Sequence, residues 1–188
     1  MFPEPGDRLF RDNADHALDK AFINYFSNAI DQYILGYQQA AEALINLSLE
    51  DRTKKDVLIY PIIFIYRQYV ELRLKECIGT LNFCIHGKRE FPNHHYLDKL
   101  WEAFKDLYKE AGESITDNDF KNMDRLILEF YSKDPTSMVF RYPSDKKGKT
   151  FLAKTEIDIR NFSEVMVKVS AFLDACSDFI ANLKDNLP

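Results

Sequence analysis

The stretch of residues 57–75 reads VLIYPIIFIYRQYVELRLK. Its first ten residues, 57–66, are apolar on every side of a helical wheel, which is typical of a helix enclosed by other helices. Pro61 lies near the first turns, where a proline either kinks a helix or marks its start. We therefore predict a central buried helix over residues 54–81, with an apolar run too short to cross a bilayer.

Amphipathic stretches flank this central helix. Apolar residues recur every three or four positions, the period of a helix with one buried face, over residues 14–47, 95–111, 119–131 and 159–183. Asn13 and Asp117 are residue types that cap helix N-termini. The chain is long enough for one hydrophobic core and short for two. We predict an all-α, up-and-down bundle of about five helices, a single domain over residues 1–188 with an N-terminal tail over residues 1–13.

A different pattern occupies residues 134–152, between the fourth and fifth predicted helices. MVFRYP (138–143) alternates apolar and polar residues, SDKKGK (144–149) is typical of a turn, and TFL (150–152) follows. Alternation with a period of two indicates strands. We predict a short β-hairpin inserted before the last helix, and such insertions often line functional sites.

Charge and cysteine content narrow the classes of function. The 25 Lys and Arg against 30 Asp and Glu give a net charge of −5, whereas a non-specific nucleic-acid coat protein is usually basic. A small cationic pocket is compatible with this balance, because it needs only a few side chains. Cys77, Cys84 and Cys176 include no C-x-x-C pair, and residues 1–12 contain no apolar run. We expect reduced thiols, no secretory leader, no membrane span and a cytoplasmic location.

Arg67 is the residue that the helical pattern explains least. On a helical wheel it shares the apolar face of Ile63 and Leu74, although an arginine in an apolar stripe is costly unless it is paired. Glu71 lies one turn further on, at ideal spacing for an ion pair. Two interpretations are open: a structural Arg67–Glu71 ion pair, and an anion-binding arginine that the neighbouring carboxylate holds in position.

Two histidines, His94 and His95, stand at the start of the third predicted helix. A helix N-terminus carries free N–H groups and the positive end of the helix dipole, so it attracts phosphate and favours a neutral imidazole that can act as a base. The alternative is that one histidine caps or packs while the other is solvated. Cys84 and His86 complete no zinc site with this pair, because the spacing fits no common pattern, and we expect no metal and no other cofactor.

The predicted hairpin adds a further polar group. Arg141 lies inside its apolar strand, where its neighbours Phe140 and Tyr142 point to the opposite face. Asp145 and Lys146 follow in the turn, where a solvated tip is the alternative to a ligand contact. The candidate catalytic residues are His95, Arg67, Glu71 and Arg141, and the candidate ligand-binding residues are Lys146, His94, Asp145 and Tyr142.

Together these segments resemble HEPN-type proteins, in particular an uncharacterised bacterial branch. The resemblance is carried by YPIIFIYRQYVELRLK (60–75), by H-x-L-x-x-L-W (95–101) and by FRYPSDKKG (140–148), and it covers about residues 20–180. It implies a helical bundle that dimerises and, in many members, is a metal-independent endoribonuclease of bacterial toxin–antitoxin or phage-defence systems. In those nucleases a histidine follows an arginine by four to six residues on one helix. Arg67 matches the arginine, whereas residues 71–73 are Glu, Leu and Arg.

Two functional hypotheses follow. In the first, the chain binds RNA or a nucleotide phosphate in a small cationic pocket and is a weak or conditional ribonuclease. Arg67 and Arg141 then neutralise phosphate, His95 moves the proton, and Glu71 orients Arg67. In the second, the same residues form a structural network in a non-catalytic helical interaction module. We also expect a homodimer, for which Tyr33 and Tyr37 are candidate contact residues, and the resemblance implies an antitoxin-like protein partner.

Overall fold

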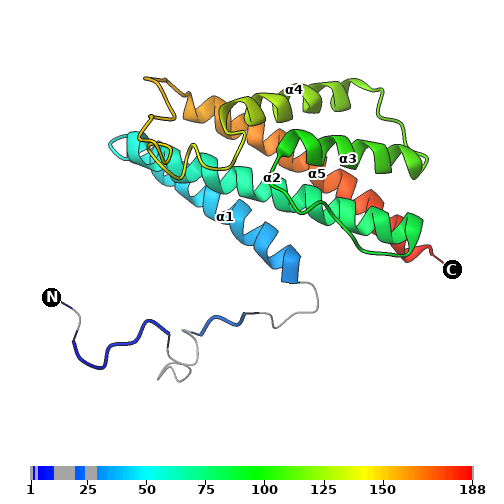
Figure 1. The fold of residues 1–188 in the computed structure, drawn as a ribbon, viewed down its shortest axis with the longest axis horizontal. Helices are drawn as coiled ribbons and strands as arrows, with labels where there is room; N and C mark the ends of the chain where they lie inside the picture. Colours follow the sequence, from blue (N-terminus) through cyan, green and yellow to red (C-terminus); the bar gives the residue numbers. More distant parts are fainter. Residues whose placement is uncertain (1, 3, 11–19, 24–28, 188) are drawn as a thin grey trace.

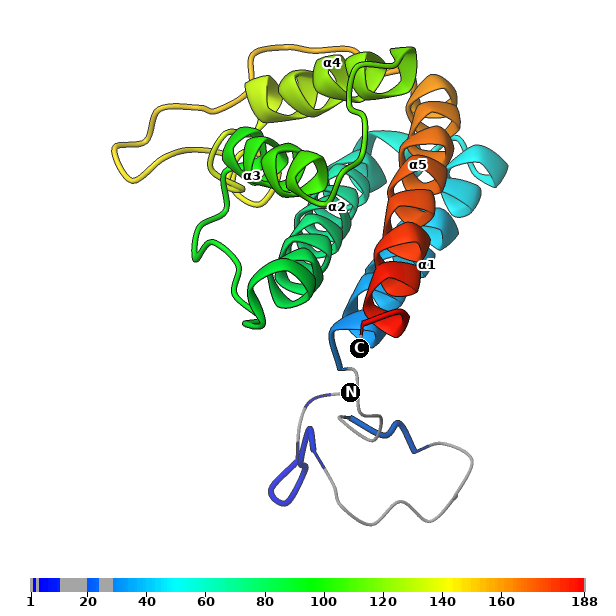
Figure 2. The same cartoon turned by 90° about the vertical axis from the view of Figure 1, so that its right-hand side faces the viewer.

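The structure is a computed structural model that describes residues 2, 4–10, 20–23 and 29–187. Within these residues the chain forms five α-helices and no strand, which confirms the predicted all-α bundle. The helices are α1 (Ala29–Glu50), α2 (Lys55–His86), α3 (Leu97–Glu110), α4 (Asn118–Lys133) and α5 (Ile159–Asp185). Helix α2 lies at the centre and packs against α1, α3 and α5, while α4 packs on α3 (Figure 1, Figure 2).

The central helix is longer than its sequence pattern predicts. Helix α2 continues past residue 81 to His86, and Gly87 ends it with a left-handed φ of 73° while its N–H donates to the carbonyl of Phe83. Glycine adopts this conformation without strain, which makes it the usual residue just after a helix. Tyr66, Val70 and Leu74 are almost completely buried, which confirms the predicted burial for the middle of the helix, whereas Val57 and Tyr60 at its start are 70% and 49% exposed.

Aromatic side chains fix α3 and α4 to the rest of the bundle. The Trp101 ring stacks on Phe104 and Phe120, with centroid distances of 5.3 and 5.9 Å. Phe120 in turn meets Phe172 of α5 edge to face at 5.0 Å. The predicted helix cap is also confirmed, because the Asp117 side chain accepts a hydrogen bond from the Phe120 N–H at 2.9 Å. This packing holds α3 and α4 against each other and against α5.

The prediction for the start of the first helix is wrong within the described residues. Residues 20–23 are not helical, and α1 begins at Ala29. Asn13, the predicted cap, lies outside the described residues. Phe22 and Ile23 are 60% and 78% exposed, so their periodic apolar pattern is not buried against the bundle. A helix without such packing is only marginally stable in water.

The predicted β-hairpin over residues 134–152 is also wrong. Only an isolated bridge joins Ser144 and Thr150, and the N–H groups of Arg141 and Tyr142 both donate to the Met138 carbonyl, as in a helical turn. The cause lies at the start of the segment, where the Asp134 carboxylate accepts hydrogen bonds from the N–H groups of residues 138 and 139. These local side-chain bonds replace the partners that a strand would need.

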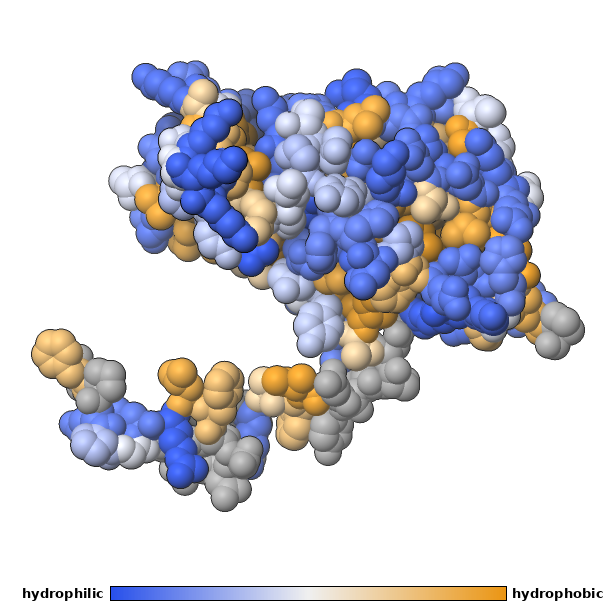
Figure 3. Space-filling model, viewed as in Figure 1, coloured by the Kyte–Doolittle hydropathy of each residue, from blue (hydrophilic) through white to orange (hydrophobic). Residues whose placement is uncertain are grey.

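Polar side chains cover most of the visible surface, and apolar ones gather in patches between them (Figure 3). None of the described helices carries an apolar stretch that is long enough to span a membrane.

Candidate functional site

The centre of the candidate site is the guanidinium of Arg67, which is fully buried on α2. Each of its three nitrogens donates a hydrogen bond. Nε donates to the carbonyl of Asp134 at 3.1 Å, Nη1 to Glu71 Oε2 at 3.1 Å, and Nη2 to the carbonyl of His95 at 2.7 Å. Asp134 caps the end of α4, and His95 precedes α3. One buried side chain therefore ties together three segments that are distant in the sequence.

Glu71 is the buried carboxylate of the site, with a side chain that is 1% exposed. Oε2 accepts from Arg67, while Oε1 accepts from Lys75 Nζ at 3.0 Å and contacts His95 Nδ1 at 2.7 Å. Burial alone raises the pKa of Glu71, but the hydrogen bonds from His95 and Lys75 and the positive charge of Lys75 outweigh it, so the pKa is lowered. Glu71 is therefore an ionised acceptor at neutral pH.

The imidazole of His95 lies at the edge of this network, with 67% of its side chain exposed. Because an ionised carboxylate can only accept, Nδ1 carries the proton in its contact with Glu71. The neutral ring then has its lone pair on Nε2, and none of the described residues hydrogen-bonds to Nε2. The buried network thus fixes the tautomer and orientation of a largely exposed imidazole whose second nitrogen stays unbonded among the described residues.

Asp134 completes the network from the end of α4. Its Oδ1 accepts from the N–H groups of Met138 and Val139 at 2.9 and 3.2 Å. Its Oδ2 is 3.6 Å from Arg67 Nε and has no hydrogen-bond partner. At that distance the contact is electrostatic, because a hydrogen bond of this kind is shorter. The turn that follows holds Ser137 at a φ of 63°, a conformation that non-glycine residues seldom adopt.

The structure thus brings together three of the four predicted catalytic residues, Arg67, Glu71 and His95, in one hydrogen-bonded network. The first hypothesis has Arg67 neutralise a bound phosphate. In the structure the guanidinium is enclosed, and all three of its nitrogens donate to protein acceptors. In this geometry Arg67 positions the site. It is not exposed to a ligand.

Arg141 does not join the network. It is exposed, and its guanidinium lies over the rings of Phe64 and Tyr142, 5.4 and 5.3 Å from their centroids. Within the part of the chain that the structure describes, no hydrogen bond or ion pair joins it to Arg67, Glu71 or His95. Its expected role in neutralising phosphate beside Arg67 gains no support from this position.

The predicted ligand-binding residues are spread over two loops. The Asp145 carboxylate accepts from the N–H groups of Lys147 and Lys149 and so closes its own turn, with Lys146 exposed at the tip. His94 Nδ1 accepts from the Tyr96 N–H at 3.3 Å, and the two rings lie 5.6 Å apart. Tyr142 is 47% exposed beside Arg141. Of these four residues, only His94 lies beside the network, because it directly precedes His95 in the sequence.

Sequence reasoning missed two members of the network. Lys75 lies four residues after Glu71 on the same helix. This spacing predicts an ion pair, so the contact of Lys75 with Glu71 could have been predicted from the sequence. Asp134 carried no such signal, because it reaches Arg67 across 67 residues of sequence through tertiary packing.

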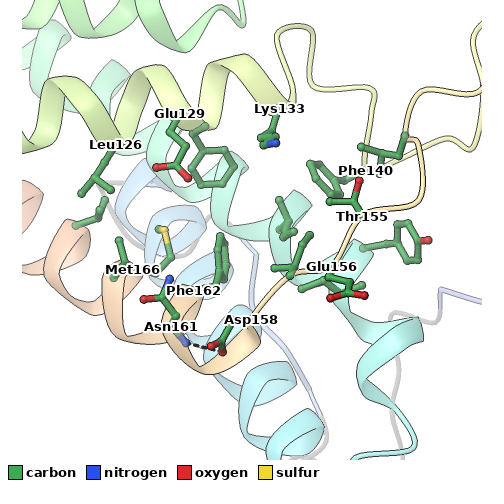
Figure 4. Close-up of a pocket in the computed structure, with 18 of the residues that line it drawn as sticks. Leu126, Glu129, Lys133, Phe140, Thr155, Glu156, Asp158, Asn161, Phe162 and Met166 are labelled. Carbon is green, nitrogen blue, oxygen red and sulfur yellow. Dashed lines mark hydrogen bonds between the residues drawn. The ribbon is translucent and has the colours of Figure 1, made fainter.

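A separate cleft of about 950 Å³ lies between α2, α4, the segment 152–158 and α5. Figure 4 shows Glu129 and Lys133 of α4 on one side and Thr155, Glu156 and Asp158 on the other. Apolar side chains form much of its wall, and the charged side chains that line it are equally divided between cations and anions. The cations are Arg125, Lys133 and Lys154, and the anions are Glu129, Glu156 and Asp158. The lining therefore gives no preference for a ligand of either charge.

Among the described residues, no three His, Cys, Asp or Glu side chains come together in a way that would hold a metal ion. No family model matches the chain, and neither a curated protein nor a solved structure matches it.

Proposed function

We propose that the chain is a helical module that binds the phosphate of RNA or a nucleotide at the surface beside His95, with this imidazole as the acid–base group. The observation that carries the proposal is the contact of His95 Nδ1 with the buried carboxylate of Glu71, in a ring that is 67% exposed and whose Nε2 has no hydrogen-bond partner among the described residues. A carboxylate that holds one nitrogen of an imidazole fixes its tautomer and stabilises the protonated ring.

The charge balance of the network supports weak binding. Arg67 and Lys75 carry two positive charges, and Glu71 and Asp134 carry two negative ones, so the site is formally neutral while the imidazole is neutral. Proton uptake by His95 adds one positive charge at the surface. The site therefore attracts a phosphate mainly when His95 is protonated. Such a dependence fits the weak or conditional activity that we infer.

The resemblance to HEPN proteins supplies the substrate class, RNA, and an antitoxin-like partner that restrains activity in bacterial defence. In the proposed reaction, His95 Nε2 takes the proton of a ribose 2′-hydroxyl, and the 2′-oxygen attacks the adjacent phosphorus. The bond to the 5′-oxygen of the next nucleotide breaks, and that oxygen receives a proton from the imidazolium. The products are a 2′,3′-cyclic phosphate and a 5′-hydroxyl, and no metal takes part.

An RNA-cleavage assay with single-stranded RNA and excess chelator tests this proposal. We expect slow cleavage to cyclic phosphate ends, and a loss of rate of about 10² to 10⁴-fold in His95→Ala, the usual range for one acid–base group. His86→Ala is the matched control, because His86 is 48% exposed and its nearest carboxylate, Glu110, is itself exposed. We expect this variant to behave as wild type.

The readout for binding is separate from cleavage. Adenosine monophosphate or RNA should shift the NMR signals of the His95 ring and leave those of His86 in place. Wild-type protein that neither cuts RNA nor shows a shift of the His95 signals would remove the proposal.

A second candidate function is a non-catalytic helical interaction module in which the network is structural. The observation that favours it is the complete enclosure of Arg67, whose three nitrogens all bind protein acceptors. This candidate predicts that His95→Ala lowers stability and that adenosine monophosphate or RNA leaves the His95 ring signals of the wild type unshifted. The NMR titration therefore separates the two.

A further inference from the structure

A small pocket lies near the start of α2, and its lining residues come from α2 and from the segment 139–152. Its volume is about 350 Å³, at the lower end of the range for sites that take small organic molecules. Tyr60 and Tyr142 both line it, and they are 49% and 47% exposed. We call this cavity the tyrosine pocket. Two accessible phenol rings at one cavity offer packing surface to another aromatic ring.

Arg141 is the only charged side chain among the residues that line the tyrosine pocket. Its guanidinium lies over the rings of Phe64 and Tyr142, 5.4 and 5.3 Å from their centroids. Among the described residues, this guanidinium makes a single hydrogen bond, a long one of 3.5 Å from Nη2 to the Tyr142 hydroxyl. Most of its five N–H donors are therefore available to a ligand. An anionic group next to an aromatic ring matches this lining.

The turn beside the tyrosine pocket is positively charged, although the chain has a net charge of −5. Lys146, Lys147 and Lys149 are exposed, and none of them forms an ion pair within the part of the chain that the structure describes. The one carboxylate of this turn, Asp145, accepts from N–H groups of the turn itself. Figure 3 shows strongly hydrophilic side chains at the left of the bundle, where Figure 1 draws this loop. Such a local excess of cations attracts a polyanion.

The tyrosine pocket and His95 lie on the same side of α2. Arg141 lies over Phe64, whereas His95 contacts Glu71. Positions 64 and 71 are separated by about two helical turns, so they share one face of the helix and lie about 10 Å apart along its axis. A single phosphate group is too small to contact both places. Neighbouring nucleotides of one strand are large enough to do so.

An aromatic ring beside an anionic group is the chemistry of a nucleotide. Stacking of a base on an aromatic side chain tolerates any base, because every base has a π-face. The larger cleft of about 950 Å³ does not share this preference for an anion, because cations and anions line it in equal number.

We propose that the tyrosine pocket is a nucleotide subsite in which a base stacks on Tyr60 and Tyr142 while Arg141 binds phosphate. The strand continues along α2 to His95, and the lysines of the turn bind phosphates on the other side of the pocket. Because RNA is the ligand of the proposed function, this subsite rests on that proposal. It adds a requirement for length, since the ligand spans several nucleotides and a mononucleotide fills only one of the two places.

Binding of hexa-adenylate with 2′-O-methyl riboses, which cannot be cut at the 2′ position, tests the subsite. We expect this hexamer to bind at least about tenfold more tightly than adenosine monophosphate, because it occupies both places at once. Tyr142→Ala should weaken hexamer binding at least about fivefold, the low end of what one stacked base contributes. Tyr142→Phe keeps the ring and should bind as wild type does. Arg141→Ala should reduce the slope of log K against log salt by about 0.7, the value for one phosphate contact on a single strand.

Tyr33→Ala and Lys184→Ala are the matched controls. Tyr33 is 53% exposed on α1, so it is an accessible tyrosine outside the pocket. Lys184 is an exposed cation at the C-terminal end of α5, at the opposite end of the bundle from the loop that follows α4 (Figure 1). We expect both variants to bind the hexamer as wild type does.

NMR signals of the tyrosine and histidine rings separate a failure of the subsite from a failure of the proposed function. We expect the hexamer to shift the signals of Tyr142 and His95 together. A shift of His95 alone, or equal binding by wild type and Tyr142→Ala, would overturn the subsite and leave the proposed function standing. A mononucleotide that shifts Tyr142 and binds as tightly as the hexamer would overturn the continuous strand, because the pocket would then take a free nucleotide. If neither ring responds to either ligand, both proposals fail.

Discussion

Replacing Arg67 with alanine removes the side chain that ties α2, α3 and α4 together. The variant loses hydrogen bonds to Glu71 and to the carbonyls of Asp134 and His95. It leaves two carboxylates in the interior, one 1% exposed and the other fully buried, of which Glu71 keeps Lys75 as a partner. Removing one partner of a buried ion pair costs about 3–5 kcal/mol, because the remaining charge stays in a medium that solvates it poorly.

Thermal and urea unfolding, followed by circular dichroism, measure this loss. For a chain of this size, about 1 kcal/mol shifts the melting temperature by about 2–4 °C, so Arg67→Ala should lower it by about 6–20 °C. Arg67→Lys should fall in between, because it keeps the charge and loses the planar set of donors. Arg125→Ala is the control, since Arg125 and Glu129 are both exposed and 3.7 Å apart. Such surface pairs contribute about 0–1 kcal/mol. A loss below about 1 kcal/mol in Arg67→Ala would show that the buried guanidinium does not hold these segments together.

Two further predictions concern the carboxylates. The pKa of Glu71 is lower when folded than its ordinary value of 4.5, so its contribution to stability is present above that value and is lost as pH falls through the folded pKa. Glu71→Gln should therefore flatten the acid limb of stability against pH below 4.5, and an unchanged limb in urea titrations would contradict this. Asp134→Ala should cost about 1–3 kcal/mol, because the N–H groups of Met138 and Val139 lose their acceptor. These two amides should then exchange faster with deuterium, and unchanged protection would contradict the assignment.

The local periodicity of apolar residues was enough to predict the five helices of the bundle. The apolar run over residues 57–66 identified α2 as the central helix, and Asp117 correctly marked the start of α4. The same reasoning failed at residues 20–23, because amphipathic periodicity predicts a helix only where another element covers the apolar side. It failed at residues 138–143 because one carboxylate, Asp134, draws two N–H groups into a turn, and alternation alone does not reveal that acceptor.

The candidate site could likewise be predicted from the sequence only in part. Arg67 and Glu71 are four residues apart on one helix, so their contact follows from helix geometry. The approach of His95 was a hypothesis about tertiary structure, and the structure brings it to Glu71. Arg141 was placed by a strand that does not form, and it lies instead over Phe64. The enclosure of Arg67 depends on α3 and α4 together, and no local pattern encodes it.

The tautomer of His95 reports whether the buried carboxylate of Glu71 orients this exposed imidazole. Nitrogen-15 NMR of the histidine rings distinguishes the two neutral forms. We predict a proton on Nδ1 of His95 in the wild type and a shift toward the Nε2-protonated form in Glu71→Gln, with His86 unchanged in both proteins. A wild-type ring protonated on Nε2, or a ring that does not respond to Glu71→Gln, would contradict the account.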